Sequence, residues 1–157
     1  MKNKFFISII LLFFVSSCSI SNPLKKEAKV TYLDCPKSLI LLPASKIIIN
    51  NSTIELPNEY QLNCYQINQS EIVEFSIDYK LILKLSEEEI KEHQILFLAF
   101  ITNKNEDKKL EELRVEKNLG LNKSNKNTFE YNFNDKIQIA IEDYKKGIKL
   151  FIGISEY

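Results

Sequence analysis

The stretch IVEFSIDYKLILKL, residues 72–85, decides the fold class of this chain. Its odd-numbered positions, Val73 to Leu85, are all apolar or aromatic, whereas the even positions from Glu74 to Lys84 are polar or charged except for Ile82. A period of two places one row of side chains on each face of a β-strand, whereas a helix would scatter these residues around its axis. We therefore expect a long strand at the centre of a sheet, with one face in the core and the other in water.

Shorter segments with strand character flank this stretch on both sides. The polar stretch 50–58 predicts an exposed loop. Ser86 and Glu89 have the spacing of a helix-capping pair and predict a single helical turn. Residues 94–102 are apolar at successive positions from 95 to 101 and predict a strand buried on both faces. The other predicted strands lie at residues 30–33, 38–42, 46–49, 60–67, 108–117, 129–133, 137–141 and 148–154.

About eight or nine short strands separated by polar turns predict an all-β fold, either an antiparallel sandwich or a barrel. The chain has no tryptophan, which disfavours an antibody-type domain. We expect a single immunoglobulin- or fibronectin-like β-sandwich over residues 30–157, and a closed barrel is the alternative.

Residues 1–17 have the pattern of a cleaved secretory signal peptide. Lys2 and Lys4 precede an apolar run from Phe5 to Val15, which is shorter than the ~20 residues that span a bilayer. The following Val15-Ser16-Ser17-Cys18 resembles the lipobox of bacterial lipoproteins. That resemblance implies diacylglycerol on the Cys18 thiol, cleavage just before it and a stable membrane anchor. The alternative is an ordinary secreted protein whose signal happens to contain a cysteine.

Residues 18–29 are expected to form the lipidated cysteine and a flexible leader that holds the domain off the membrane. Ser19 replaces the aspartate that many inner-membrane lipoproteins carry after the cysteine, so the resemblance favours the outer membrane, with the domain facing the periplasm. Loss of Lys2 and Lys4 leaves 19 basic against 21 acidic residues, a net charge near −2. This balance gives no electrostatic reason to bind nucleic acid.

Once Cys18 carries lipid, Cys35 and Cys64 are left as one pair in an oxidising compartment. We predict a disulfide between them, which would stabilise the domain by roughly 3–4 kcal/mol in the chain-entropy model. The alternative is two buried free thiols.

Several features are present from Cys35-Pro36 onward: the second cysteine within residues 60–65, the alternating strand 73–85, the apolar stretch 95–101 and the closing residues 150–153. Together they are similar to the pattern of a family of alphaproteobacterial envelope lipoproteins of unknown function. Members of that family continue past the glycine with a longer polar tail, whereas only residues 154–157 follow Gly153 here. The resemblance supplies no catalytic residues.

The residues needed for common catalytic and metal sites are sparse. His93 is the only histidine, and we expect it in a turn before a strand. Three glycines cannot build a phosphate-binding loop. We therefore expect no enzymatic activity, no cofactor and no metal site. Tyr32, Tyr60, Tyr65 and Tyr144 lie near predicted strand ends, where a core edge or a binding face could use them.

Two functional hypotheses follow. The first is a membrane-tethered binding or structural module that engages another envelope protein through a sheet face or edge. The alternative is a carrier of small apolar ligands, with a cavity enclosed by a β-barrel.

The lipobox yields a direct test at Cys18. Replacement Cys18→Ser removes the sulfur that accepts diacylglycerol, so we expect loss of lipid labelling and accumulation of the uncleaved precursor. Metabolic labelling with a radioactive fatty acid, together with an immunoblot of precursor and mature forms, measures both effects. Continued labelling and processing of the Cys18→Ser protein would contradict the lipobox interpretation.

Overall fold

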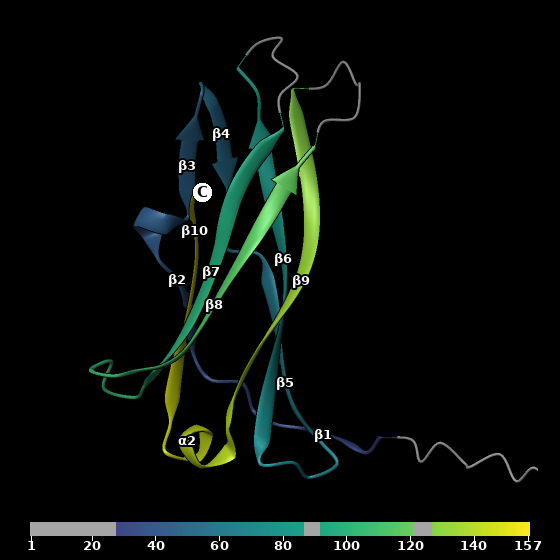
Figure 1. Cartoon of the computed structure of the whole chain (residues 1–157), viewed down its shortest axis with the longest axis vertical. Helices are drawn as coiled ribbons and strands as arrows, with labels where there is room; N and C mark the ends of the chain where they lie inside the picture. The colour runs from purple at the N-terminus through teal and green to yellow at the C-terminus, as the bar shows by residue number, and fades with distance from the viewer. Residues whose placement is uncertain (1–27, 87–91, 121–126) are drawn as a thin grey trace, which may run out of the picture.

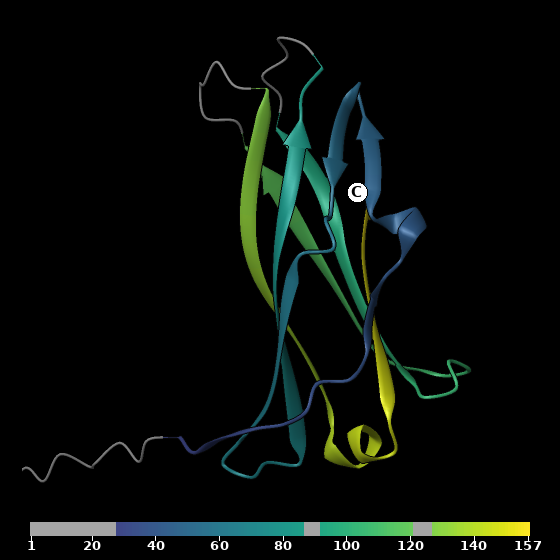
Figure 2. The ribbon, with the colours of Figure 1, turned by 180° about the vertical axis from the view of Figure 1, so that it is seen from behind.

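The computed structural model describes residues 28–86, 92–120 and 127–157, which form two β-sheets facing each other. Figure 1 shows β10, β7 and β8 in one layer and β5, β6 and β9 in the other, and Figure 2 shows the same layers from behind. In chain order the elements are β1 (Val30–Tyr32), β2 (Ser38–Ile40), the 3-10 turn η1 (Leu42–Ala44), β3 (Lys46–Ile49), β4 (Ser52–Glu55), β5 (Tyr60–Ile67), β6 (Ile72–Lys84), β7 (His93–Asn103), β8 (Lys109–Leu119), β9 (Thr128–Ala140), α2 (Ile141–Lys145) and β10 (Ile148–Glu156).

The two sheets stay separate, so the described strands form an all-β sandwich and not a closed barrel. The six-stranded sheet has the order β1-β5-β6-β4-β3, with β9 on the other edge of β6. The four-stranded sheet has the order β2-β10-β7-β8. One pair departs from the expected antiparallel arrangement, because β2 runs parallel to β10. Strands from the beginning and the end of the domain therefore meet in the same sheet.

Strand β6 confirms the prediction made from its alternating sequence. It is central, since β9 pairs with it along residues 72–84 on one edge, and β5 and β4 share the other edge. The side chains from Val73 to Leu83 at odd positions are buried. The expectation of a water-facing row at the even positions is wrong for Glu74 and Ser76, which are also buried.

The interior of the sandwich is filled by apolar side chains from both sheets. At its centre the rings of Tyr79 in β6 and Phe97 in β7 stack, with centroids 3.9 Å apart and an angle of 11° between their planes. Such burial of aromatic and aliphatic groups supplies most of the favourable energy of folding. The largest fully buried side chains are those of Ile54, Phe75, Ile77, Leu81, Leu83, Ile95, Phe97, Ile101, Leu119, Leu150, Ile152 and Ile154.

The exposed loop predicted over residues 50–58 is wrong, because Ser52–Glu55 forms β4 and Ile54 is fully buried. Strands β3 and β4 make a hairpin whose two turn residues, Asn50 and Asn51, have φ angles of 48° and 62°. Positive φ at both positions is the requirement of a tight two-residue hairpin turn, which asparagine tolerates better than most residues. The turn-forming residues therefore mark a hairpin and not a loop.

Three smaller expectations also need correction. His93 is the first residue of β7 and is buried, so it is not a turn residue. Strand β7 buries only one face fully, since Leu96, Leu98 and Phe100 on the other face are half-buried. Strand β9 is continuous from residue 128 to 140, and Ile141 begins α2 instead of extending the strand. The helical turn predicted at 86–89 and most of the loop predicted at 119–126 lie outside the described residues.

The predicted disulfide is present. Cys35, between β1 and β2, is bonded to Cys64 in β5, and their Cα atoms lie 5.4 Å apart. A backbone hydrogen bond of 2.8 Å from Leu33 N to Cys64 O accompanies it. The bridge therefore joins the first segment of the domain to a strand adjacent to β6.

A charged pair lies between the sheets on the side formed by β8 and β9. The Lys117 ammonium lies 2.8 and 2.7 Å from the two carboxylate oxygens of Asp135, and the Tyr79 hydroxyl donates a 2.6 Å hydrogen bond to the same carboxylate. The ammonium also lies 4.7 Å from the centre of the Phe133 ring. Burial, followed by the neighbouring Asp135, raises the pKa of Tyr79, so its hydroxyl remains a donor. Lys117 from one sheet and Asp135 from the other thus join the two layers.

This pair predicts an asymmetric response to mutation. Asp135→Asn leaves the Lys117 charge buried without its partner, and we expect the free energy of unfolding to fall by about 3–5 kcal/mol. The double replacement Lys117→Met with Asp135→Leu removes both charges, so it should be closer to the native protein in urea unfolding. Equal losses in the single and double variants would contradict the pairing.

Candidate functional site

The outer face of the six-stranded sheet carries a row of polar side chains that crosses three strands. The strand register places Tyr65, Asn63 and Gln61 of β5 opposite Glu74, Ser76 and Asp78 of β6. On the other edge of β6, these three residues face Gln138, Lys136 and Asn134 of β9. Side chains directly opposite on neighbouring strands are close enough to interact, so the register aligns them in three cross-strand rows. We call these nine residues the polar ladder.

Glu74 is the most highly connected carboxylate of the polar ladder. It accepts hydrogen bonds from the Tyr65 hydroxyl and, at 2.7 Å, from the Gln138 amide, and it lies 2.7 Å from the Lys136 ammonium. The bond to Lys136, followed by the bond to Tyr65, lowers the pKa of Glu74 from 4.5 to about 2. Glu74 is therefore a fixed anion at neutral pH, and it raises the pKa of Lys136 in turn.

A second set of bonds holds Asp78, two residues further along β6. The Asn134 amide donates to Asp78 at 2.6 Å and contacts the Ser76 hydroxyl at 2.7 Å, and the Asn63 amide donates to Asp78 at 3.3 Å. These bonds position side chains from three strands without a ligand.

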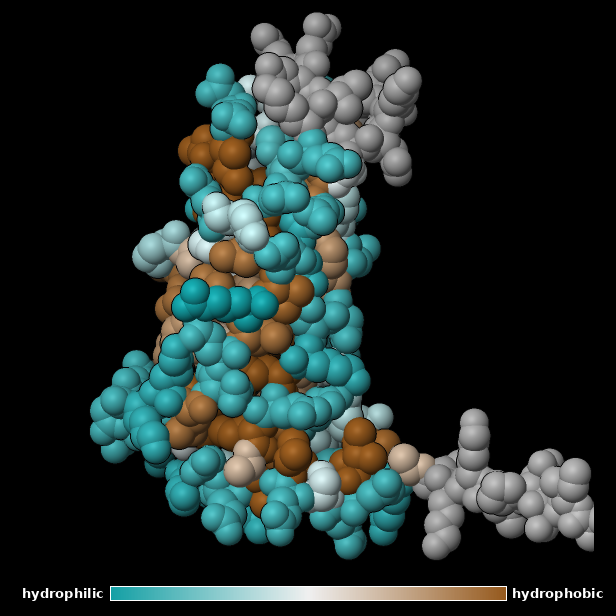
Figure 3. All heavy atoms as spheres, viewed as in Figure 1, coloured by the Kyte–Doolittle hydropathy of each residue, from teal (hydrophilic) through white to brown (hydrophobic). Residues whose placement is uncertain are grey.

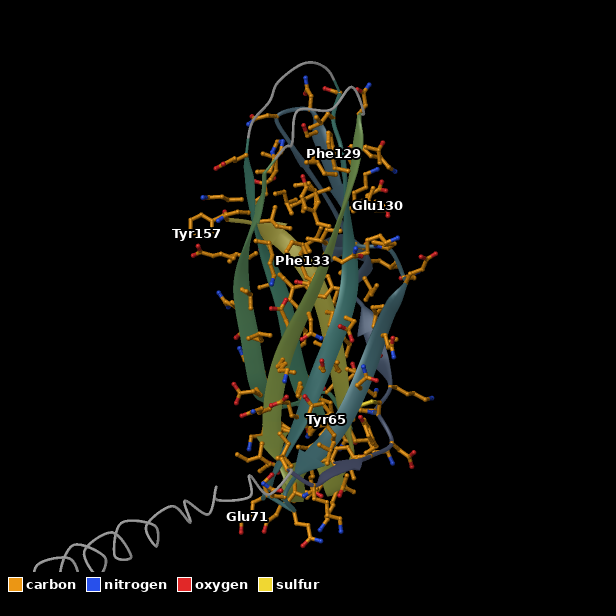
Figure 4. All side chains as sticks on the ribbon, turned by 90° about the vertical axis from the view of Figure 1, so that its right-hand side faces the viewer. Tyr65, Glu71, Phe129, Glu130, Phe133 and Tyr157 are labelled. Carbon is orange, nitrogen blue, oxygen red and sulfur yellow. A yellow bond between two sulfur atoms is a disulfide. The ribbon has the colours of Figure 1, made fainter. Side chains whose placement is uncertain are left out.

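The polar ladder leads into a shallow, open hollow of about 560 Å³. Figure 4 looks onto this side of the molecule, with Tyr65 and Phe133 at different heights along the sheet. The hollow lies where β5 begins and β4 ends. Lys80 of β6 falls between the two pairings, so neither β5 nor β4 is hydrogen-bonded beside it. Its lining residues are Glu59, Tyr60, Gln61, Asp78, Tyr79, Lys80, Asn132, Phe133 and Asn134.

The side chains on this face can act as hydrogen-bond donors and acceptors. Carboxylates, amides and a lysine surround the hollow, and His93 lies on β7 of the other sheet. In residues 28–86, 92–120 and 127–157, no group of three or more histidine, cysteine or acidic residues is arranged to hold a metal ion. No helix among these residues is long and apolar enough to cross a membrane.

The residues predicted from the sequence are distributed as follows. Cys18 lies outside the described residues, whereas Cys35 and Cys64 form the disulfide. Of the four tyrosines considered, Tyr65 belongs to the polar ladder and Tyr60 lines the hollow. Tyr32 is exposed beside β5, and the Tyr144 hydroxyl donates to the Asp34 carbonyl.

The contribution of β9 to this site was not predicted. Two separate strands were expected at 129–133 and 137–141, with Asn134 and Asp135 as an interruption, but these two residues point to opposite faces of a continuous strand. The even positions from Glu130 to Gln138 are all polar, and this alternation was the available signal.

Comparisons with protein-family models, with curated proteins and with solved structures find no match to this chain.

The pKa of Glu74 predicts how stability depends on pH. Because its folded pKa is lowered, Glu74 stabilises the fold above pH 4.5, and this contribution is lost as the pH falls toward about 2. We expect Glu74→Gln to lower the free energy of unfolding by about 1–2 kcal/mol at pH 7 and by less at pH 3. Urea unfolding at pH 7, 5 and 3 measures this convergence.

The matched control is Glu130→Gln, a charge removal on the same face at an exposed carboxylate 3.0 Å from Lys80. An exposed ion pair contributes little to stability, so the free energy of unfolding of this variant should match that of the native protein at every pH. A constant difference between Glu74→Gln and the native protein from pH 7 to 3 would contradict the role given to Glu74.

Proposed function

We propose that this protein is a lipoprotein of the bacterial envelope, anchored in the outer membrane through Cys18, whose periplasm-facing β-sandwich binds another envelope protein through the polar ladder and its hollow. The observation that carries the binding role is the ordering of this face by side-chain hydrogen bonds across three strands. A partner that meets a preorganised surface loses less side-chain entropy on binding.

The hollow also presents polar groups that remain available to a partner. Within the described part of the chain, the side chains of Glu59 and Asn132 make no hydrogen bond, and Gln61 makes only a 3.5 Å contact to Asn63. Lys80 has a single ion pair, with Glu130. The hollow thus offers hydrogen-bond donors and acceptors together with positive and negative groups, which a polar surface of another protein could bind.

The carrier hypothesis receives less support from the geometry. It requires a closed barrel around an apolar cavity, whereas the described strands form two sheets whose inward side chains fill the space between them. A surface site therefore accounts better for the arrangement than an internal one.

Site-specific photocrosslinking in intact envelopes tests the proposal. A photoreactive phenylalanine analogue at Asn132 should give a discrete adduct with one protein. The same analogue at Arg114, an exposed residue on β8 in the other sheet, should not.

Replacement Asp78→Ala removes the carboxylate that orients Asn134 and Asn63, and it should reduce the Asn132 adduct by about tenfold.

The control for Asp78→Ala is Glu112→Ala, which removes a carboxylate from the outer face of β8. It should leave the Asn132 adduct unchanged. An adduct that forms equally from Asn132 and Arg114, or that survives Asp78→Ala, would contradict binding through this face.

A further inference from the structure

Five lysines line one hollow at the end of the sandwich that carries α2. They come from four separate places in the chain: Lys37 just before β2, Lys104 in the β7–β8 turn, Lys145 and Lys146 at the end of α2, and Lys149 in β10. The hollow has a volume of about 460 Å³, and its other lining residues are Gly147 and Ile148, so no carboxylate lines it. We call these five lysines the lysine pocket.

The backbone around the lysine pocket is held in place by specific contacts. Gly147 has a φ of 88°, a conformation that favours glycine, and a Cβ atom at this position would lie 3.5 Å from Lys104 Cδ. The stem of Lys104 therefore packs over the turn that follows α2. The Lys37 carbonyl accepts a 3.2 Å hydrogen bond from Leu150 N, which fixes the segment before β2 to β10.

Two of the five charges have acidic partners outside the pocket. Lys146 lies 2.9 Å from Asp143, and Lys149 is paired with Glu106. Lys37, Lys104 and Lys145 make no ion pair with any residue of the described chain. The lysine pocket therefore keeps an excess of positive charge, and like charges gathered in this way favour an anionic ligand.

The lysine pocket lies at the end where the chain enters the domain, and this position indicates where such an anion would come from. Strand β1, where the chain enters the domain, lies at the same end of the molecule as α2 (Figures 1 and 2). Val30 lies twelve positions after Cys18, and at ~3.5 Å per residue this stretch reaches at most about 40 Å. The 13 residues of β6 alone span about the same length. The end with α2 is therefore the end at which the segment that follows Cys18 joins the domain.

Exposed apolar side chains lie at this end as well. Val30, Ile67 and Ile72 are each more than a third exposed, where β1 pairs with β5 and where β6 begins. Figure 3 shows hydrophobic residues on this end of the surface. Apolar side chains accompanied by lysines are the combination that favours the interface of an anionic bilayer.

We propose that the lysine pocket binds the phosphate of an anionic lipid headgroup in the membrane that holds the anchor. The inference rests on the proposed function, since it takes Cys18 to be lipidated. Ammonium groups donate charge-assisted hydrogen bonds to phosphate oxygens, and Lys37, Lys104 and Lys145 all line the one hollow that the headgroup would enter. Contact there would hold the sandwich with its α2 end toward the bilayer.

Chemical footprinting of lysines on the mature lipidated protein tests this assignment. The protein is placed in vesicles of phosphatidylcholine alone or of phosphatidylcholine with phosphatidylglycerol, and lysine acetylation is followed by mass spectrometry. The attraction of one lysine to an anionic surface favours the surface-bound position over the free one by about fivefold. Acetylation of Lys104 and Lys145 should therefore slow by about that factor in the anionic vesicles. Lys84, at the far end of β6, should be unaffected.

Two variants give a matched comparison within one turn. Lys104→Gln removes a lysine of the pocket, and it should reduce the protection of Lys145. Lys108→Gln removes a lysine of the same β7–β8 turn that does not line the pocket, and it should leave that protection intact. Thermal unfolding of both variants checks that the fold is retained.

A third sample, with phosphatidylcholine vesicles and millimolar inorganic phosphate, separates lipid from soluble phosphate. Protection by anionic lipid, with or without an effect of inorganic phosphate, supports the proposal. Protection by inorganic phosphate alone, equal protection of Lys84 and Lys145, or no protection in any sample overturns it. The intact mass of the protein reports lipid on Cys18 separately, so failure of the anchor is distinguishable from failure of the lysine pocket.

Discussion

Strand β6 is hydrogen-bonded along both edges while one of its faces fills the core, and the remainder of the structure depends on this constraint. One edge pairs with β9 over residues 72–84, and the other is divided between β5 and β4. Because side chains alternate strictly along a strand, a shift of one residue in either pairing would turn Phe75 and Ile77 into water. The same register aligns Glu74 and Asp78 with their partners on β5 and β9, so the core and the polar ladder are fixed together.

The sequence predicted the features that depend on local pattern and missed those that depend on pairing. Strand β6 and the Cys35–Cys64 bridge were predicted, since alternation and a single cysteine pair are visible along the chain. Strand β4 was missed because four residues between turn formers carry too little periodicity. The pairing of Asp135 could not be predicted, because its partners Lys117 and Tyr79 come from other strands.

The two proposed contact surfaces occupy different parts of the sandwich and would operate together. The polar ladder runs along the flank of the six-stranded sheet, whereas the lysine pocket lies at the α2 end. A domain held to the bilayer by that end would keep its flank in the periplasm, open to another protein. The rigid layers between the two surfaces, joined by the Lys117–Asp135 pair, would keep their relative orientation constant.

The disulfide has a mechanical consequence for a domain held by its N-terminus. Load applied through the leader first reaches the three residues of β1, and after Cys35 it passes through the sulfur bridge into Cys64. Cys64 is paired with Phe75 of β6, so the force enters the centre of the six-stranded sheet. The 28 residues between the two cysteines, which include β2, β3 and β4, lie outside this path, so a pull on the N-terminus cannot unravel them one after another. The bridge would thus protect the domain against force applied at its N-terminus.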